Sequence, residues 1–546
     1  MLKKPDEDSV GTWVGPEPTI PEPDIVETLD TEVLICGAGT GGMVAAIVAG
    51  KQGVKTLVIE KNPKEGYFKT YIGAVDTRAQ KAAGDKARIN KAEIVQELTS
   101  YPFNYGQAKL FSGANEVDEE LVWLWANESG QAVDFLADEL AEYGITHVAE
   151  YDTGTGYHGI YKAYPTHTKF LVPILKGGMP VHGGIGSLER WLLKKAKSYG
   201  VTFKFNTSLV KLVKNGDRVV GAIARKKDGS YIRIHASKGV LLCTGGYADD
   251  QELFAKLNPV AAAVTTFSYC QPGNAGDGIK AGIWAGGEKD LYPAAMLFDR
   301  GLTKPGGKSG LPFRTGGGFD AFHFGSQPFL KVNMDGKRFC CESVPYDLIL
   351  YPLQNEKNGV CCIIWDARYW QNIESFHTIG CSRQIASPSK PATQEGFGKL
   401  LTFQLLTMAA LKGYIQKANT IEALAVKLKL PVDSFKATVE RYNQMAQAGV
   451  DEDFGKPAKD LIALETPPFY GATNAGWLLT TMDGLHINTD MQVLDTGGNV
   501  IEGLYAAGDV AGGFFANCYP ELVVGVACGK TITFARHAIL HMTGAI

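Results

Sequence analysis

Glycines at fixed spacing near the start of the chain could hold the phosphates of a nucleotide. Residues 37–42 (GAGTGG) follow the apolar run Val33–Cys36 and open an alanine- and valine-rich stretch. Gly37 permits a tight turn, Gly39 lets the backbone approach a pyrophosphate, and Gly42 lets the following helix pack closely on the strand. A helix that begins here would offer free N–H groups and partial positive charge to the phosphates.

An acidic residue ends the next apolar run. Thr56–Ile59 indicates a second buried strand, and it is followed by Glu60 and Lys61, which begin eighteen residues after Gly42. A carboxylate at this place can accept hydrogen bonds from ribose hydroxyls and disfavours a cofactor with a 2′-phosphate. The order strand, glycines, helix, strand and acid therefore predicts a dinucleotide site, and we include Lys61 among its residues.

Two later strands also end in glycines. The run 238–247 (KGVLLCTGGY) places Gly245 at the end of an apolar strand, where the backbone could approach a cofactor closely. The run 503–509 (GLYAAGD) does the same near the C-terminus with Gly508 and Asp509. A cofactor-binding fold that is split around an insertion explains why such glycines recur so far apart in the chain.

The elements that must position these glycines follow from the spacing of apolar residues. Apolar residues recur every three or four positions, which predicts helices over 91–99, 117–143, 397–412, 420–428, 432–448 and 521–542. Residues 219–225 and 232–236 flank Asp228-Gly229 and predict a β-hairpin.

Changes along the chain in the pattern of strand-like, glycine-rich and helical segments predict its domains. We expect an extended N-terminal tail over 1–29 and an α/β, Rossmann-like cofactor domain made of 30–260 and 469–546. An inserted α+β substrate-binding cap domain would occupy 261–468.

The bulk composition excludes several classes of function. A net charge of −4 with 21% charged residues leaves no polybasic surface for nucleic acid or an anionic membrane. Every long apolar stretch is interrupted by glycine or flanked by polar residues, so no membrane span is expected. The ten cysteines form no C-x-x-C pair, and the N-terminus has no signal-peptide pattern. These features predict a cytoplasmic protein without a metal site, although a cluster built from distant cysteines stays open.

Taken together, these segments resemble the flavoprotein family of fumarate reductases and 3-ketosteroid dehydrogenases over nearly the whole chain. The matching segments are Val33–Lys61, Gly239–Tyr247, Asn274–Gly278, Val332–Glu342, Thr481–Asn488 and Gly503–Gly513. The resemblance implies FAD as the cofactor, with Glu60 on the adenosine ribose. Binding would be noncovalent, because the loop after Lys61 lacks the family's histidyl attachment motif. It also implies that Asp509 contacts the ribitol or phosphates and that a final helix, beginning near Leu522 and Val523, faces the flavin N1–C2=O edge.

The positions at which fumarate reductases bind a dicarboxylate are changed in this chain. The arginine expected beyond the motif 336–342 (GKRFCCE) is Tyr346. Leu479-Thr480 stands where a histidine is expected, and Cys518-Tyr519 where a second arginine is expected. A dicarboxylate would then lie unpaired in a buried pocket, which argues against fumarate as the substrate.

The replacements are instead similar to those of the ketosteroid dehydrogenases and related bile-acid ene-reductases. That resemblance implies hydride exchange between flavin N5 and the carbon–carbon bond next to a ketone, in a 3-oxo-steroid or bile acid. Tyr346 would exchange a proton at the α-carbon, and Tyr519 would donate a hydrogen bond to the ketone oxygen. One departure is Val523, which stands near the position of a glycine that helps to bind the steroid carbonyl.

Two other functions stay open at this point. The chain could reduce another enone or an acrylate, although the sequence places no arginine to anchor a carboxylate. It could also be a flavin electron-transfer subunit, but its large inserted region argues against a simple carrier. The expected partners are a small hydrophobic ketone and an electron donor or acceptor that the sequence does not identify.

Other aromatic and ionisable residues are weaker candidates. Tyr157, Tyr161 and Tyr164 could line the substrate pocket. His182 and His486 are expected to have structural roles.

Overall fold

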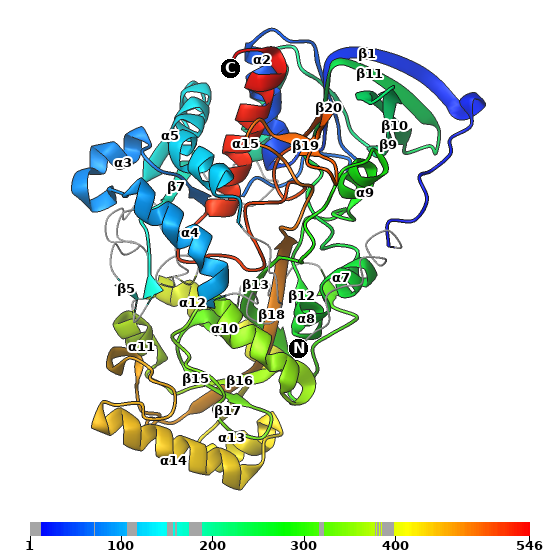
Figure 1. Cartoon of the computed structure of the whole chain (residues 1–546). Helices are drawn as coiled ribbons and strands as arrows, with labels where there is room; N and C mark the ends of the chain where they lie inside the picture. The colour runs from blue at the N-terminus through cyan, green and yellow to red at the C-terminus, as the bar shows by residue number, and fades with distance from the viewer. Residues whose placement is uncertain are drawn as a thin grey trace.

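The structure of this chain is a computed structural model. It describes residues 13–69, 71–105, 117–149, 157–158, 161–173, 188–315, 322–376, 378, 382, 384 and 398–546. Figure 1 shows two lobes, and each is built on its own β-sheet.

The sheet of the first lobe is mostly parallel. Its main strand order is β19-β20-β11-β1-β2-β8, and β10 and β9 join it through β11. The strands β20, β11, β1, β2 and β8 run parallel to one another, while β19, β10 and β9 pair antiparallel. Their bounds are β1 (Ile25–Cys36), β2 (Thr56–Ile59), β8 (Thr202–Lys204), β9 (Thr207–Asn215), β10 (Arg218–Lys226), β11 (Tyr231–Leu242), β19 (Gln492–Leu494) and β20 (Val500–Ala506). The predicted α/β, Rossmann-like class is confirmed.

The helices of the first lobe pack mainly on this sheet or on one another. They are α2 (Thr40–Lys51), α3 (Arg78–Ala83), α4 (Lys91–Tyr105), α5 (Glu119–Ala141), α6 (Leu188–Ser198), α9 (Asp277–Trp284) and α15 (Val526–Thr543). The helices α2 and α15 lie side by side, and α5 packs on α15 (Figure 1). The first and last helices of the lobe therefore form one layer, although they are far apart in the sequence.

Small β-elements complete the first lobe. A three-stranded sheet contains β3 (Ile72–Gly73), β7 (His167–Leu171) and β4 (Thr146–Ala149). A two-stranded ribbon joins β5 (Tyr157–His158) to β6 (Tyr161–Lys162).

The second lobe contains a mixed sheet around one long strand. β18 (Phe469–Thr481) pairs with β12, β13, β16 and β17, and Figure 1 shows it running from the second lobe toward the first. The other strands are β12 (Thr265–Ser268), β13 (Ala295–Thr303), β14 (Arg314–Thr315), β15 (Leu330–Asn333), β16 (Cys361–Trp365) and β17 (Ile415–Ala418). The predicted domain boundaries stay a prediction, but this sheet extends beyond residue 468 to the end of β18.

The helices of the second lobe lie mainly around this sheet. They are α10 (Tyr346–Leu350), α11 (Tyr369–Phe376), α12 (Gly398–Leu411), α13 (Ile421–Leu428) and α14 (Val432–Ala448), while α7 (Gln251–Leu257) and α8 (Pro259–Ala263) connect β11 to β12. The side chain of Thr420 caps α13 by accepting a hydrogen bond from the Ala423 N–H at 3.1 Å.

Most predicted elements agree with the structure, but the last helix begins later than expected. It starts at Val526 after Gly525, whose φ of 78° makes a left-handed turn. The Val523 N–H donates to the Pro520 carbonyl oxygen in a separate turn. Leu522 and Val523 therefore precede α15, and the prediction of a helix from residue 521 was wrong. At the other end of the chain, β1 begins at Ile25, inside the predicted tail.

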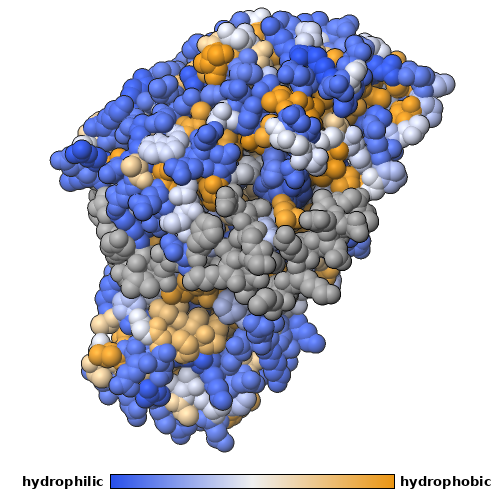
Figure 2. Space-filling model, viewed as in Figure 1, coloured by the Kyte–Doolittle hydropathy of each residue, from blue (hydrophilic) through white to orange (hydrophobic). Residues whose placement is uncertain are grey.

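The described part of the tail lies along the first lobe. The Trp284 indole N–H donates to the Gly15 carbonyl oxygen at 2.9 Å, and Lys211 pairs with Glu17 at 2.6 Å. On the face shown in Figure 2, hydrophilic residues predominate on both lobes and apolar residues occur in small groups. Within the described residues, no helix has the length and apolar character needed to cross a membrane.

Candidate functional site

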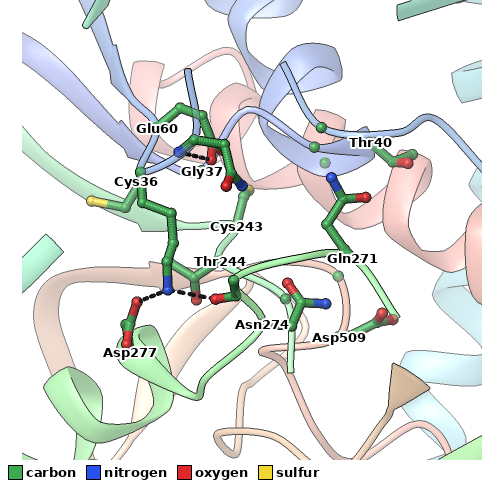
Figure 3. Close-up of a pocket in the computed structure, with 18 of the residues that line it drawn as sticks. Cys36, Gly37, Thr40, Glu60, Cys243, Thr244, Gln271, Asn274, Asp277 and Asp509 are labelled. Atoms are coloured by element: carbon green, nitrogen blue, oxygen red, sulfur yellow. Dashed lines mark hydrogen bonds and ion pairs between the residues drawn. The ribbon is translucent and has the colours of Figure 1, made fainter. Parts of the chain in front are cut away.

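A cleft opens in the first lobe at the carboxyl ends of its parallel strands. It measures about 860 Å³ when the space open to solvent is included. Its walls contain the ends of β1, β2 and β11, the loop Gln271–Asp277 and the segment Ala507–Asp509 (Figure 3). In open α/β sheets, ligands bind in this position.

The glycines of the first turn have different surroundings. Gly37 has a φ of 105°, and a Cβ there would lie 2.4 Å from the Cys243 carbonyl oxygen. A Cβ on Gly42 would lie 1.8 Å from the Gly37 carbonyl oxygen, so helix α2 could not pack as it does. A Cβ on Gly39 would meet nothing within 4 Å, because this residue faces the open cleft.

The start of α2 is suited to an anion. Its N-cap is Gly39, which supplies no side-chain hydrogen bond to the first turn. Thr40 and Gly41 follow and line the cleft. The N–H groups and the partial positive charge of this helix end are therefore available to a phosphate.

Glu60 is fixed by the backbone on either side of it. Its Oε2 accepts a hydrogen bond from the Ala38 N–H at 2.8 Å, and its Oε1 accepts one from the Asn62 N–H at 2.8 Å. The carboxylate is buried but lines the cleft. Because a carboxylate oxygen can accept more than one hydrogen bond, Glu60 keeps the capacity to bind ribose hydroxyls.

The opposite wall contains Gly245 and the loop before α9. Gly245 has a φ of 73°, and a Cβ there would lie 2.8 Å from the Asn274 Oδ1. Lys61 reaches this wall, where its Nζ lies 2.5 Å from the Asp277 Oδ2 and also donates to the Gly273 carbonyl oxygen. Figure 3 shows Asn274 and Asp277 on this side of the cleft.

Gly508 and Asp509 lie on the segment that follows β20. Gly508 has a φ of 90°. The Asp509 carboxylate accepts hydrogen bonds from Lys69 at 2.9 and 3.0 Å and from the Thr480 Oγ1 at 2.8 Å. These contacts bring together residues from three distant parts of the chain.

A buried hydroxyl in the cleft has no partner in the described part of the protein. This is Thr244 Oγ1, and its residue lines the cleft beside Gly245. An unpaired buried hydroxyl is costly, so a polar ligand that reaches it would gain a hydrogen bond. Together with the glycine turn and Glu60, this hydroxyl shows that the cleft fits a dinucleotide.

A second pocket lies at the start of α10, around Tyr346. Its lining includes Asp299, Ser326, Glu342, Ser343, Ser382, Glu521 and Leu522. The Tyr346 side chain is 5% exposed, and its hydroxyl lies 3.2 Å from Arg300 Nη2 and 2.5 Å from Ser382 Oγ. The guanidinium donates to the phenol oxygen, which stabilises the ionised form of the phenol.

Arg300 is the functional candidate that sequence reasoning missed. It belongs to β13 and is only 3% exposed. Its Nε donates to Ser326 Oγ at 2.8 Å, and this hydroxyl donates to Asp299 Oδ1 at 2.7 Å. The signal was present in the sequence, because Asp299-Arg300 interrupts the apolar run Ala294–Leu302 with two charges.

Two carboxyl groups hold the segments of the two predicted catalytic tyrosines together. The Tyr346 N–H donates to Glu521 Oε2 at 3.3 Å, and the Tyr519 N–H donates to Asp347 Oδ2 at 3.4 Å. Burial raises the pKa of Asp347 to about 8. Burial, with the negative charge of Asp299, raises the pKa of Glu521 well above its usual value. Asp347 therefore favours the neutral acid around pH 7.

The remaining candidates lie in different places. Tyr519 is buried, and its ring packs 5.9 Å from that of Phe515. Leu522 lines the Tyr346 pocket, while Val523 forms a β-bridge with Tyr164. The side chains of Tyr157 and Tyr161 and the whole of His182 lie outside the described residues.

His486 has carboxylate partners on both ring nitrogens. Its Nε2 lies 2.9 Å from Asp290, and its Nδ1 lies 3.2 Å from Glu288. Both carboxylates raise its pKa, against the effect of burial. This arrangement agrees with a structural role.

The cofactor fold is matched by a model of known proteins described as "FAD binding domain", over residues 32–521. The chain belongs to this family. It is therefore an FAD-dependent oxidoreductase, as the sequence predicted. Noncovalent attachment stays a prediction.

Similar proteins cover nearly the whole chain. The vinyl phenol reductase of Lactiplantibacillus plantarum is 27% identical over 93% of this chain and 96% of its own length. A 3-oxosteroid 1-dehydrogenase of Mycobacterium tuberculosis is 26% identical over 94% of this chain and 98% of its own length. The fold is also similar to that of the 3-ketosteroid Δ1-dehydrogenase of Sterolibacterium denitrificans, with a TM-score of 0.69 at 19% identity over 95% of this chain and 100% of that one. The predicted resemblance to ketosteroid dehydrogenases is thus confirmed.

Proposed function

We propose that this enzyme interconverts a C=C and a CH–CH bond next to the ketone of a hydrophobic ring substrate, a 3-oxo-steroid or bile acid. The observation that carries the proposal is the Tyr346 phenol, which faces the second pocket and receives a hydrogen bond from Arg300. The 3-oxosteroid 1-dehydrogenase relative supports the same substrate class.

FAD would supply the two-electron chemistry when it is bound. In this proposal, residues 37–42 and Glu60 hold its nucleotide half, Lys61 and Gly245 line the same cleft, and Gly508 and Asp509 hold its central part. Leu522 and Val523 stay candidates for contacts near the flavin, although they lie before the last helix.

The second catalytic requirement is a proton at the α-carbon of the ketone. In the direction of reduction, Tyr346 donates its phenol proton to that carbon, and in the direction of dehydrogenation the phenolate accepts it. Arg300 favours proton donation in the direction of reduction, because its hydrogen bond to the phenol oxygen stabilises the negative charge left on that oxygen. In the direction of dehydrogenation, the same hydrogen bond holds the oxygen in position to accept the proton. A neutral phenol also suits an uncharged apolar substrate better than a buried ion does.

Tyr519 is proposed to donate a hydrogen bond to the ketone oxygen. Negative charge develops on that oxygen during the reaction, so a fixed donor there stabilises the transition state. The hydrogen bond from its backbone N–H to Asp347 ties this residue to the neighbour of Tyr346.

Replacing Tyr346 tests the proposal directly. The Tyr346→Phe enzyme should keep its bound flavin spectrum, while turnover of a 3-oxo-steroid enone falls by about a hundredfold or more. Tyr470→Phe is a matched control, because this tyrosine lies in β18 and stacks on Trp365 instead of lining the pocket. Unchanged turnover in Tyr346→Phe would contradict the assignment.

A second candidate function is reduction of an alkene conjugated to an acidic group, such as a carboxylate or a phenol. Arg300 favours it, because a buried guanidinium beside Tyr346 is the positive charge that such a group needs. The vinyl phenol reductase relative points to the same class. Anaerobic reoxidation of the photoreduced flavin by a steroid enone, a vinyl phenol or an acrylate would separate the candidates. Reoxidation by none of them would favour an electron-transfer role.

A further inference from the structure

Two walls of the FAD cleft come from different parts of the chain and meet through a few side chains. One wall is the end of β2 with the residues that follow it, and the other is the loop before α9. Asn62 Nδ2 donates to the Pro272 carbonyl oxygen at 3.1 Å, and the Tyr67 N–H donates to Gln271 Oε1 at 3.1 Å. These contacts place the two walls within reach of each other across the cleft.

The one ion pair that joins these walls in the described residues is Lys61–Asp277. The two side chains are 28% and 32% exposed, and Nζ lies 2.5 Å from Oδ2. Both residues line the cleft and are partly open to solvent, and Figure 3 shows Asp277 among the residues of the cleft wall.

The backbone around the pair is shaped to let Lys61 lie across the cleft. Gly273 has a φ of 91°, and a Cβ there would lie 3.0 Å from Lys61 Cδ and Cε. Its carbonyl oxygen also accepts a hydrogen bond from Lys61 Nζ. Asp277 is the first residue of α9, where the helix end stabilises its negative charge. The lysine thus has two fixed acceptors on the far wall.

We propose that Lys61 and Asp277 form a clasp that retains FAD, opening when the cofactor enters or leaves and closing over it when it is bound. The proposal rests on FAD binding by this family and not on the identity of the substrate. The clasp acts on the rate at which FAD leaves, because the pair must separate before the two walls can move apart. A partly exposed ion pair of this kind should slow FAD release by about two- to fivefold.

The test is the rate of FAD release from the purified holoprotein, measured after dilution as free flavin in the ultrafiltrate. Lys61→Met and Asp277→Asn should each accelerate release by about two- to fivefold at low salt. The double variant should release FAD no faster than Lys61→Met, because both lack the ion pair and the hydrogen bond from Lys61 to the Gly273 carbonyl oxygen. Added salt should accelerate release from the wild-type protein and have less effect on the variants.

Lys51→Met is the matched control. Lys51 and Glu139 form a pair with the same 2.5 Å separation between α2 and α5, outside the cleft. This variant should release FAD at the wild-type rate. If Lys61 contacted FAD directly, Asp277→Asn would leave the rate of FAD release unchanged. If the two residues acted independently, the double variant would release FAD faster than both single variants. Either result, or an unchanged rate in both single variants, would overturn the clasp.

Discussion

The FAD cleft and the Tyr346 pocket are built in different ways. Glycines at 37, 39, 41, 245 and 508 line the cleft, and the start of α2 offers its backbone N–H groups to it. The pocket is made of side chains from β13, α10 and the segment before α15. A backbone site depends on local shape, whereas a side-chain site depends on which charges and hydroxyls the fold brings together.

The two regions also differ in their charges. At the cleft, Lys69–Asp509 and Lys61–Asp277 are paired and partly open to water. Beside the pocket, Lys331 and Asp299 are almost fully buried at 3.5 Å, next to the buried Arg300. Removing one partner from a buried pair leaves an uncompensated charge, so changes near the pocket should act through electrostatics.

The largest expected effect tests whether the cleft depends on backbone shape. In Gly42→Val, the new Cβ would lie 1.8 Å from the Gly37 carbonyl oxygen, and no side-chain rotation relieves that contact. We expect purified protein to contain almost no FAD, measured by its flavin absorbance. Gly53→Ala is the control: its φ of 73° makes the substitution mildly destabilising, but a Cβ there meets nothing within 4 Å and the residue does not line the cleft, so FAD content should stay normal. Normal flavin content in Gly42→Val would show that FAD binding does not depend on the shape of this turn.

The second-largest expected effect tests whether turnover at the Tyr346 pocket depends on the positive charge of Arg300. Arg300→Met removes the guanidinium that donates to the Tyr346 phenol and should lower turnover by about ten- to a hundredfold. Flavin content should stay normal, because Arg300 does not line the cleft. Arg300→Lys keeps the positive charge and should recover part of the activity. Equal turnover in Arg300→Met and wild type would remove this residue from the mechanism.

A smaller effect concerns the pH dependence of stability. Burial raises the pKa of Asp347 to about 8, so between the ordinary carboxyl pKa and pH 8 the folded protein holds a proton that the unfolded chain has lost. The free energy of unfolding should therefore fall as pH rises through this window, by at most about 1.4 kcal/mol per pH unit.

Asp347→Asn cannot titrate and should lose less stability than wild type between pH 6 and pH 8. Its amide oxygen can still accept the Tyr519 N–H. Thermal midpoints measured at several pH values would show the two curves converging at low pH. Parallel curves would mean that Asp347 is ionised in the folded protein.

The smallest expected effect concerns the hydroxyl of Thr244 in the cleft. Thr244→Val removes a buried hydroxyl that has no partner among the described residues. The protein without FAD should become more stable, by up to about 1 kcal/mol, while FAD binds more weakly. Thermal shifts with and without FAD would measure both changes. Equal shifts in the two states would mean that this hydroxyl does not meet the cofactor.

The cofactor region could be predicted because its signals are local in sequence. Residues 37–42 and Glu60 lie within one strand–helix–strand unit, and the predicted family and α/β class are confirmed. The start of the last helix was misplaced because its apolar spacing continues into the preceding turn. Only the left-handed conformation of Gly525 ends that turn and begins the helix.

The second region shows what the sequence alone left open. The change of three carboxylate-binding positions indicated that Tyr346 and Tyr519 face a less acidic substrate. Spacing along the chain does not predict contacts between side chains of different elements, such as Arg300 and Tyr346, which are 46 positions apart. Arg300 reaches the Tyr346 phenol because β13 and α10 pack together in the second lobe. The sequence by itself determined the family, the cofactor and the glycine turn, since these depend on short-range backbone geometry. Tertiary structure decided which charge lies beside Tyr346 and which carboxyl groups have raised pKa values, because burial and long-range packing set both.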